Sequence, residues 1–272
     1  MTITLIHAPR PLGPPTLTPV GLRLEQHVTL NAPRRRANPV VAGLNVFMGL
    51  LYGRRPSLTK FLVLEHLAQV PYRSWERVAQ RRIARTGGRS ALARRIQVRV
   101  AEARGQQDNE QWHMLVLEEL LARRGHRLNR FRYRVLPRLL AAPWQVTTWL
   151  LHLAKPAWSY RLNAAFESHA EHEYMRYVAD NPQLDRELFA SELADRWDHP
   201  VTVADVLRQI GHDERCHKLD SIAAIDGEPQ PADDPTRTHT DAYDAAACRP
   251  RDRPSPGPQP PSPGGARRRP RD

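Results

Sequence analysis

The chain has 272 residues, a formal net charge of +12 and 25 prolines. Its two cysteines are too few for a disulfide framework, and the N-terminus lacks the basic start, apolar run and cleavage site of a signal peptide. Residues 227–272 hold 11 of the prolines and almost no large apolar residue. Such a composition does not bury enough surface to offset the entropy of ordering, so a disordered Pro/Arg-rich tail is predicted there.

The remaining residues divide into two parts. Residues 1–37 are interrupted by proline and arginine, and we expect a partly ordered N-terminal arm. Residues 38–226 are sparse in glycine and proline after residue 57 and rich in leucine, alanine and arginine, which favours helices over strands. The sequence therefore predicts one all-α domain over residues 38–226.

The first two long helices have clear end signals. Ser57 is a plausible N-cap for a helix that either runs through Pro71 with a kink or restarts after it. The TGG stretch at residues 86–88 ends this helix. A second helix is predicted over residues 90–124, where Gly125 ends it.

Three further helical stretches follow. One covers residues 130–155 with an interruption near Pro143, and the next covers residues 157–179. The last is capped by Thr202 or Asp205 and runs to about residue 225.

Two stretches, residues 39–52 and 139–154, carry no formal charge. They are short for a membrane span, which needs about 20 apolar residues. The second follows the arginine-rich residues 122–138, and aromatic residues flank it. This pattern is typical of a helix lying in a membrane interface, and a buried core helix is the alternative.

Two Glu-x-x-His pairs lie in predicted helices, Glu110 with His113 and Glu214 with His217. Residues three apart share a helix face, so a carboxylate and an imidazole can reach one metal ion. Asn109 and Asp213 precede the glutamates and lie on the face of each histidine, where they could orient a ligand. With 14 Glu and 12 His in the chain, one such pair alone would be consistent with chance.

Two lone glutamates complete a larger pattern. Glu65 follows the apolar run FLVL, and Glu167 shares a helix face with Glu171, a rival ligand, and with Tyr174. The order of one lone Glu, one Glu-x-x-His, a second lone Glu and a second Glu-x-x-His is the ligand set of di-iron and di-manganese carboxylate bundles. The sequence thus predicts a four-helix bundle with two metal ions. His169, His172 and Cys216 lie off these ligand faces, and we expect the histidines at the surface and Cys216 in packing contacts.

The same residues resemble a known family. The stretches FLVLEHLAQVPY (61–72), NEQWHMLVLEEL (109–120), FESHAEHEY (166–174) and DERCHK (213–218) are similar, in order, to motifs of the alternative oxidases, a family of membrane-bound di-iron quinol oxidases. They are most like the plastid terminal oxidase branch. The resemblance covers most of residues 55–225.

The resemblance implies a ferritin-like four-helix bundle with short monotopic membrane helices, a homodimer, and a membrane location facing the cytoplasm. It implies reduction of O2 to water by a membrane quinol, without proton pumping and without a nucleic-acid partner. It also implies two iron ions, a redox-active Tyr174, ligand-orienting Asn109 and Asp213, and Lys60 near the quinol where the family has Arg. The implied iron ligands are Glu65, Glu110, His113, Glu167, Glu214 and His217.

The sequence departs from the family at three further positions. Glu173 and His66 each stand where the family has Thr, and Gly211 stands where it has Arg. Glu173 belongs to the quinol pocket by position, so these changes bear on the choice of quinol and leave the metal ligands intact.

Three other functions remain open at this point. A soluble di-iron oxygenase acting on a small molecule would share every ligand. A basic helical protein that binds lipid or nucleic acid without metal would explain the arginine-rich residues 73–105 and 122–138. An iron-storing bundle is less favoured because it has no use for the uncharged stretch at residues 139–154.

Overall fold

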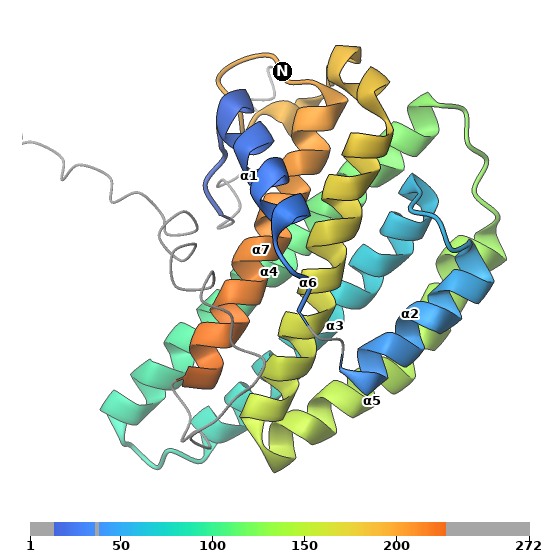
Figure 1. Ribbon diagram of the computed structural model, residues 1–272. Coiled ribbons are helices and arrows are strands. Elements are labelled where there is room, and N and C mark those ends of the chain that lie inside the picture. Colours follow the sequence, from blue (N-terminus) through green and yellow to red (C-terminus); the bar gives the residue numbers. More distant parts are fainter. Residues whose placement is uncertain (1–13, 36–37, 227–272) are drawn as a thin grey trace, which may run out of the picture.

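The computed structural model describes residues 14–35 and 38–226, which are helical throughout apart from connections and one isolated β-bridge (Figure 1). The predicted all-α class is confirmed, and the predicted tail at 227–272 lies outside the described residues. The seven α-helices of the described part are α1 (Pro19–Asn31), α2 (Pro39–Tyr52), α3 (Leu58–Ala84), α4 (Ser90–Arg123), α5 (Leu136–Ala154), α6 (Pro156–Asp180) and α7 (Val203–Asp226).

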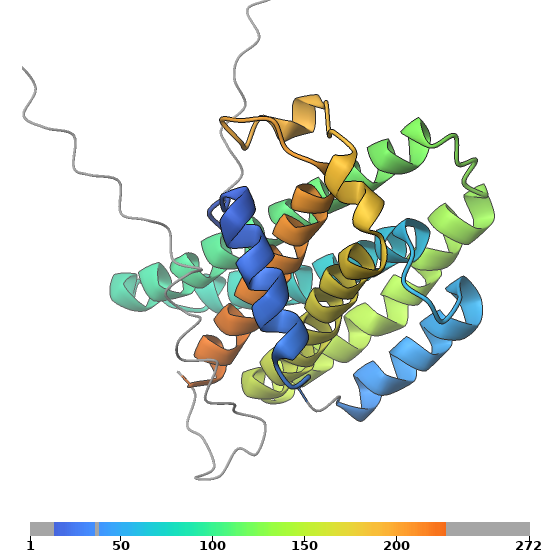
Figure 2. The same ribbon diagram turned by 45° about the horizontal axis from the view of Figure 1, so that its top comes forward.

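Helices α3, α4, α6 and α7 form the centre of the molecule (Figures 1 and 2). The closest packing is between α3 and α4 and between α6 and α7, while α5 packs against α3 and α6. The apolar faces of the four helices meet in one core, to which α3 contributes Leu64, α4 Leu117, α6 Phe166 and α7 Leu207. Any polar side chain that points inward from these helices is therefore excluded from water.

The helix ends follow the local signals. The Ser57 hydroxyl accepts the Lys60 N–H at 3.3 Å and caps α3. Gly87 and Gly88 take positive φ angles of 56° and 84° in the turn before α4, which glycine adopts without strain. At the start of α7, the Thr202 hydroxyl accepts the Asp205 N–H at 3.1 Å and the Asp205 carboxylate accepts the Thr202 N–H at 3.2 Å. The two predicted caps thus act together as one reciprocal capping box.

Two internal prolines do not break their helices. The α3 helix continues through Pro71 as one element. The predicted interruption near Pro143 is wrong, because α5 runs without a break from residue 136 to 154 after a π-helical segment, Phe131–Val135. Pro143 and Leu139, whose carbonyl the proline cannot bond, both lie on the exposed side of α5, so little buried hydrogen bonding is lost.

The N-terminal arm contains a helix that the sequence did not predict. Helix α1 lies across α6 and α7 (Figure 1). Its Glu25 carboxylate pairs with Arg215 at 3.1 Å, and its Gln26 accepts a hydrogen bond from Arg208 at 2.8 Å. These partners lie more than 180 residues away in sequence. The contact therefore could not be predicted from a local sequence pattern.

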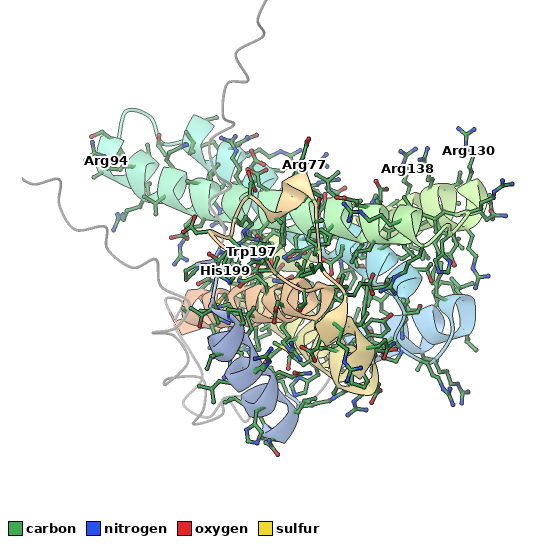
Figure 3. The ribbon with its side chains drawn as sticks, turned by 90° about the horizontal axis from the view of Figure 1, so that it is seen from above. Arg77, Arg94, Arg130, Arg138, Trp197 and His199 are labelled. Atoms are coloured by element: carbon green, nitrogen blue, oxygen red, sulfur yellow. The ribbon has the colours of Figure 1, made fainter. Side chains whose placement is uncertain are left out.

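Helices α2 and α5 lie together on one side of the bundle (Figures 1 and 2). They leave large apolar side chains exposed, namely Val40, Val46, Phe47, Leu50, Leu139, Val146, Leu150 and Leu153. None of the helices in the described part combines the length and apolar character needed to cross a membrane. Figure 3 shows Arg130 and Arg138 at one end of the molecule and Arg94 at the opposite end, all pointing outward.

Candidate metal centre

Six side chains predicted as ligands meet in the middle of the four central helices. Each is at most 1 % exposed. Helix α3 contributes one of them and α6 another, while α4 and α7 each contribute a Glu-x-x-His pair on one face. They are Glu65, Glu110, His113, Glu167, Glu214 and His217.

The six residues form two groups that share two members. In the first group, ligand atoms of Glu65, Glu110, His113 and Glu214 all lie within 4.8 Å of one another. The second group consists of Glu110, Glu167, Glu214 and His217 under the same limit. Glu110 and Glu214 belong to both groups, so each can offer one oxygen to either side. Buried Glu and His groups with this geometry can hold metal ions.

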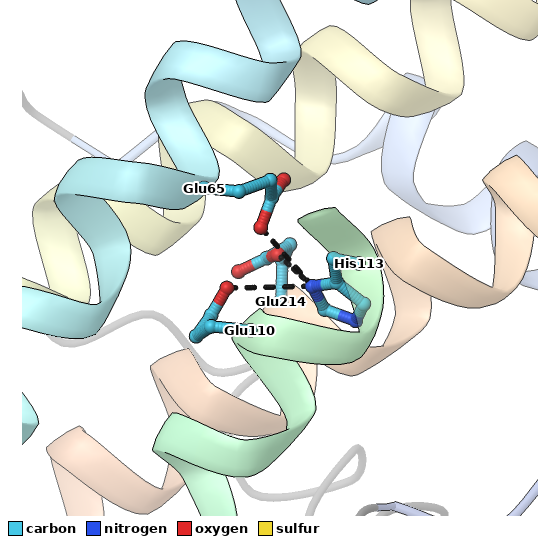
Figure 4. A group of neighbouring side chains, drawn as sticks. All are labelled: Glu65, Glu110, His113 and Glu214. Atoms are coloured by element: carbon cyan, nitrogen blue, oxygen red, sulfur yellow. Dashed lines mark hydrogen bonds and ion pairs between the residues drawn. The ribbon is translucent and has the colours of Figure 1, made fainter. Parts of the chain in front are cut away.

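The oxygen and nitrogen atoms of these side chains lie so close together that the available N–H groups cannot form a hydrogen bond to every carboxylate oxygen. The His113 Nδ1 lies 3.1 Å from Glu65, 3.3 Å from Glu110 and 3.2 Å from Glu214 (Figure 4). One Nδ1 carries at most one hydrogen, so it serves at most one of these carboxylates fully. Both carboxylate oxygens of Glu110 and Glu214 and one of Glu167 are buried without a hydrogen-bond partner among the described residues. Buried charges of this kind require counter-charge, and a cation fits the donor set.

The close approach of the buried carboxylates also shifts the pKa values of the glutamates and histidines in the cluster. Burial raises the pKa of Glu167 well above its usual value, and the carboxylates of Glu214 and Glu110 raise it further. Burial lowers the pKa of His217, but Glu110 and Glu214 outweigh burial and bring that pKa to about 10. The cluster thus attracts positive charge, and metal ions and protons compete for it.

The two predicted orienting residues contact each other and the histidines. Asp213 Oδ2 lies 3.2 Å from His113 Nε2 and accepts a hydrogen bond from Asn109 Nδ2 at 3.1 Å. This holds the His113 ring with Nδ1 toward the carboxylates, as carboxylate–histidine pairs do at metal sites. Gln209 donates to the other Asp213 oxygen at 2.7 Å.

Arg196 is a neighbour of the centre that the sequence did not reveal. It comes from the connection between α6 and α7, where its guanidinium lies 3.3 Å from Asp213 Oδ2 and 4.3 Å from the centre of the Trp112 ring. Burial raises the pKa of Asp213, but Arg196 and then His113 lower it below its usual range. No motif or helical period marks a loop arginine, so only the fold places it.

Two tyrosines extend the arrangement, and the sequence revealed only one of them. The Tyr174 hydroxyl on α6 donates to Glu65 on α3. The Tyr72 hydroxyl on α3 donates to Glu167 on α6 at 2.8 Å. Each tyrosine lies seven residues after the lone glutamate of its own helix and bonds the lone glutamate of the other helix. The spacing from Glu65 to Tyr72 was therefore a signal that sequence reasoning could have used.

The rival ligand Glu171 points to a different place. Its carboxylate accepts a hydrogen bond from Thr29 of α1 at 2.8 Å and pairs with Lys218 of α7 at 2.8 Å. It belongs to neither group of metal-ligating atoms in the described part of the chain. Glu167, one helical turn earlier, is the α6 residue that reaches the centre.

The residues assigned to the quinol pocket lie on the α3–α6 side. Lys60 and Glu173 are both buried, and Glu173 pairs with Arg34 at 3.1 Å. The expected surface position of His172 is wrong, because its ring is 95 % buried with Nδ1 2.8 Å from the Ser168 carbonyl oxygen. His169 is partly exposed; burial lowers its pKa to about 4, while Glu173 opposes the shift. Cys216 is buried beside His212, as expected from its place on α7.

No model of a known protein family matches the chain, and no curated protein matches it.

Proposed function

We propose that the protein is a di-iron quinol:oxygen oxidoreductase that lies on a membrane surface and resembles the alternative oxidases. The observation that carries the proposal is the pair of buried ligand groups that share Glu110 and Glu214. In this proposal the four central helices are a ferritin-like bundle, with Glu65 and His113 on one iron and Glu167 and His217 on the other. Manganese suits the same ligand set, so metal analysis is part of the test.

The residues fit an iron pair in charge and in number. Four carboxylates balance two divalent ions, and two imidazoles complete a mixed oxygen and nitrogen donor set. The oxygens of Glu110 and Glu214, which contact the histidines but accept no hydrogen bond from the described residues, are the atoms that would bind the ions. Two irons held there would pass electrons from the quinol to O2 and would offer the coordination positions for its reduction.

The protein side chains have their own roles in the proposal. Burial, and then the Glu65 carboxylate, raise the pKa of Tyr174 well above its usual value, so its hydroxyl keeps its proton at neutral pH. Because that hydroxyl donates to Glu65, an electron taken from the ring can be accompanied by transfer of the proton to this carboxylate. We assign Tyr174 this role. Two quinols, each giving two electrons and two protons, convert one O2 into two waters.

The membrane part of the proposal rests on α2 and α5. Both helices lie on one side of the bundle and leave large apolar side chains exposed, and Arg130 and Arg138 point outward at one end of the molecule (Figure 3). An apolar face bordered by arginines suits an interfacial position on anionic lipid. Lys60 on α3 and Glu173 on α6, both buried, are the proposed contacts to the quinol headgroup.

The deciding experiment measures oxygen uptake by membranes that contain the protein, driven by a quinol in the presence of cyanide, together with the iron content of the purified protein. The test variant is Glu214→Ala with His217→Ala. The control is Glu192→Ala with His199→Ala, which removes the same two residue types from exposed positions. We expect uptake and about two irons in the natural chain and the control, and neither in the test variant.

Other outcomes separate the rival functions. Two irons without quinol-driven uptake would replace the proposal by a di-iron oxygenase. A protein that takes up no iron or manganese under any reducing loading condition would rule out the metal centre and leave a basic lipid- or nucleic-acid-binding protein.

A second comparison tests the α6 ligand by itself. Glu167→Gln is expected to lower iron content, because the carboxamide cannot supply the charge of a carboxylate. Glu171→Gln, one turn away and also buried, is expected to keep both irons because this side chain bonds Thr29 and Lys218 instead. Equal loss in both variants would contradict the assignment of Glu167.

A further inference from the structure

A cavity of about 390 Å³ is lined by residues near the C-terminal end of α7 and by residues of the adjoining ends of α3 and α4. Figure 1 shows that α3 and α4 extend past this end of α7. The walls of the cavity come from α3, α4, α5, α6 and α7, and none of the six candidate metal ligands lines it. A volume in this range is typical of sites for small molecules. The candidate metal centre does not account for this cavity.

Three aromatic rings line one wall of the cavity. The ring centres of Trp75 and Tyr160 are 4.7 Å apart with 69° between the ring planes, and those of His152 and Tyr160 are 5.4 Å apart with the rings nearly perpendicular. Trp75 is almost fully buried, and its N–H donates to Ser159, so its position is fixed. Such a wall offers ring faces and edges to a planar apolar ligand.

His152 supplies a polar atom with no partner in the described part of the protein. Its side chain is 95 % buried, lines the cavity, and leaves Nδ1 without a hydrogen bond. Burial, and then the charge of Arg82, lower the pKa of His152 to about 4, so the ring is neutral near pH 7. The neutral His152 ring therefore adds an uncharged aromatic surface to the cavity wall.

Arginines border the opening. The cavity is lined by Arg82, Arg95 and Arg99, together with the acids Glu102 and Asp220. Glu102 lies 3.5 Å from Arg99, and Asp220 accepts a hydrogen bond from Gln106 at 2.8 Å. Arg82 and Arg95 have no ion-pair partner among the described residues, which leaves two guanidinium groups for an anion.

We propose that this cavity binds a small aromatic carboxylate. Its ring packs against Trp75 and Tyr160, and its carboxylate meets Arg82 and Arg95. The site does not depend on the oxidase function. It nevertheless lies close to the metal centre, because the Trp75 ring is 5.2 Å from the ring of Tyr72, whose hydroxyl bonds Glu167.

The first test is calorimetric titration of the purified full chain with three probes. 2-Naphthoate has the ring and the charge, 2-naphthalenemethanol has the ring alone, and cyclohexanecarboxylate has the charge alone. We expect 2-naphthoate to bind at least about tenfold more tightly than either of the others, a difference of about 1.4 kcal/mol. Absence of 2-naphthoate binding, or equal binding of the neutral alcohol, would overturn the proposal.

The second test places the probe in this cavity. Arg82→Ala with Arg95→Ala should weaken 2-naphthoate binding about tenfold, because both guanidinium groups are lost. Arg77→Ala with Arg94→Ala is the matched control: it also removes one charge from α3 and one from α4, but both arginines are exposed and neither lines the cavity.

Equal weakening in both pairs would mean that overall charge, not this site, attracts the probe, and would sink the proposal. His152→Gln provides an independent check in case the arginine pair affects folding. Its expected result is weaker 2-naphthoate binding with an unchanged circular dichroism spectrum, and unchanged affinity would count against the role of His152.

Discussion

Arg196 shows how a single residue outside the ligand set can control the centre. Its guanidinium contacts Asp213, which in turn lies 3.2 Å from the Nε2 of His113 and holds that ring. Partners of this kind commonly change metal affinity by about 10–100-fold when removed. The sequence has Gly211 where the resembling family has Arg near Asp213, and in this fold Arg196 brings a guanidinium to Asp213 from the loop.

We therefore expect Arg196→Ala to lower metal affinity at least about tenfold. A competition titration with a chelator measures this directly, with the exposed Arg130→Ala as the control for loss of one positive charge. A lysine at position 196 should recover part of the affinity. Unchanged affinity in Arg196→Ala would mean that Asp213 holds His113 without help.

His152 gives a pH dependence whose sign can be worked out. Its pKa is about 4 in the folded chain and about 6.5 when unfolded. The unfolded chain binds a proton there between these values, so the contribution of His152 to stability is present above pH 6.5 and is lost as the pH falls to 4. The full loss is about 3 kcal/mol.

The measurement is urea unfolding at a series of pH values for the natural chain and for His152→Gln. The difference in unfolding free energy between the two should shift in favour of the variant by up to about 3 kcal/mol from pH 7 to pH 4. The exposed His199→Gln should run parallel to the natural chain. A constant difference for His152→Gln would show that the folded protein admits the proton freely.

At the scale of single elements, the start of α7 matters because this helix carries Glu214 and His217. The Thr202 hydroxyl and the Asp205 carboxylate cap it reciprocally. Replacing such a cap by alanine costs about 1 kcal/mol. Thr202→Ala should lower the unfolding free energy by that amount, whereas Thr147→Ala, whose hydroxyl bonds the Pro143 carbonyl within α5, should cost less. Equal costs in urea unfolding would contradict the capping role.

The elements also show what a sequence can and cannot predict here. The ends of α3 and α4 follow from Ser57, Gly87 and Gly125, because caps and positive φ angles are local properties. That the Glu-x-x-His pairs and the lone glutamates lie close together could be predicted from the periodicity of the helices and from the order of these residues in the chain. Helix α1 and Arg196 could not be predicted in this way, because their positions depend on tertiary contacts such as those of Gln26 with Arg208 and of Arg196 with Asn109, 182 and 87 residues apart in sequence. His172 was predicted at the surface because it lies off the Glu167 face of α6, but that position is also buried in the fold.

At the scale of the whole molecule, the α2–α5 side predicts how the protein meets lipid. Phe47 and Leu150 are 44 % and 52 % exposed there. Burying two such side chains in an interface contributes several kcal/mol at most, so aspartate at both positions should weaken vesicle binding at least about tenfold.

Sedimentation with anionic lipid vesicles measures this binding. The control is Val98→Asp with Leu188→Asp, which alters two apolar residues that are at least as exposed and lie outside α2 and α5. Similar losses in both variants, or no vesicle binding by the natural chain, would contradict an interfacial role for α2 and α5.

The ligand set has an internal twofold character. The α3–α4 hairpin supplies three residues of the first group, and one of these, Glu110, also belongs to the second group. The α6–α7 pair supplies three residues of the second group, and one of these, Glu214, also belongs to the first group. The crossed bonds of Tyr72 and Tyr174 repeat the same exchange. Neither helix pair alone contains all the residues of one group. Each pair nevertheless supplies two of the four glutamates and one of the two histidines. Two copies of a single helical hairpin, facing each other, would therefore present the same donors as this one chain.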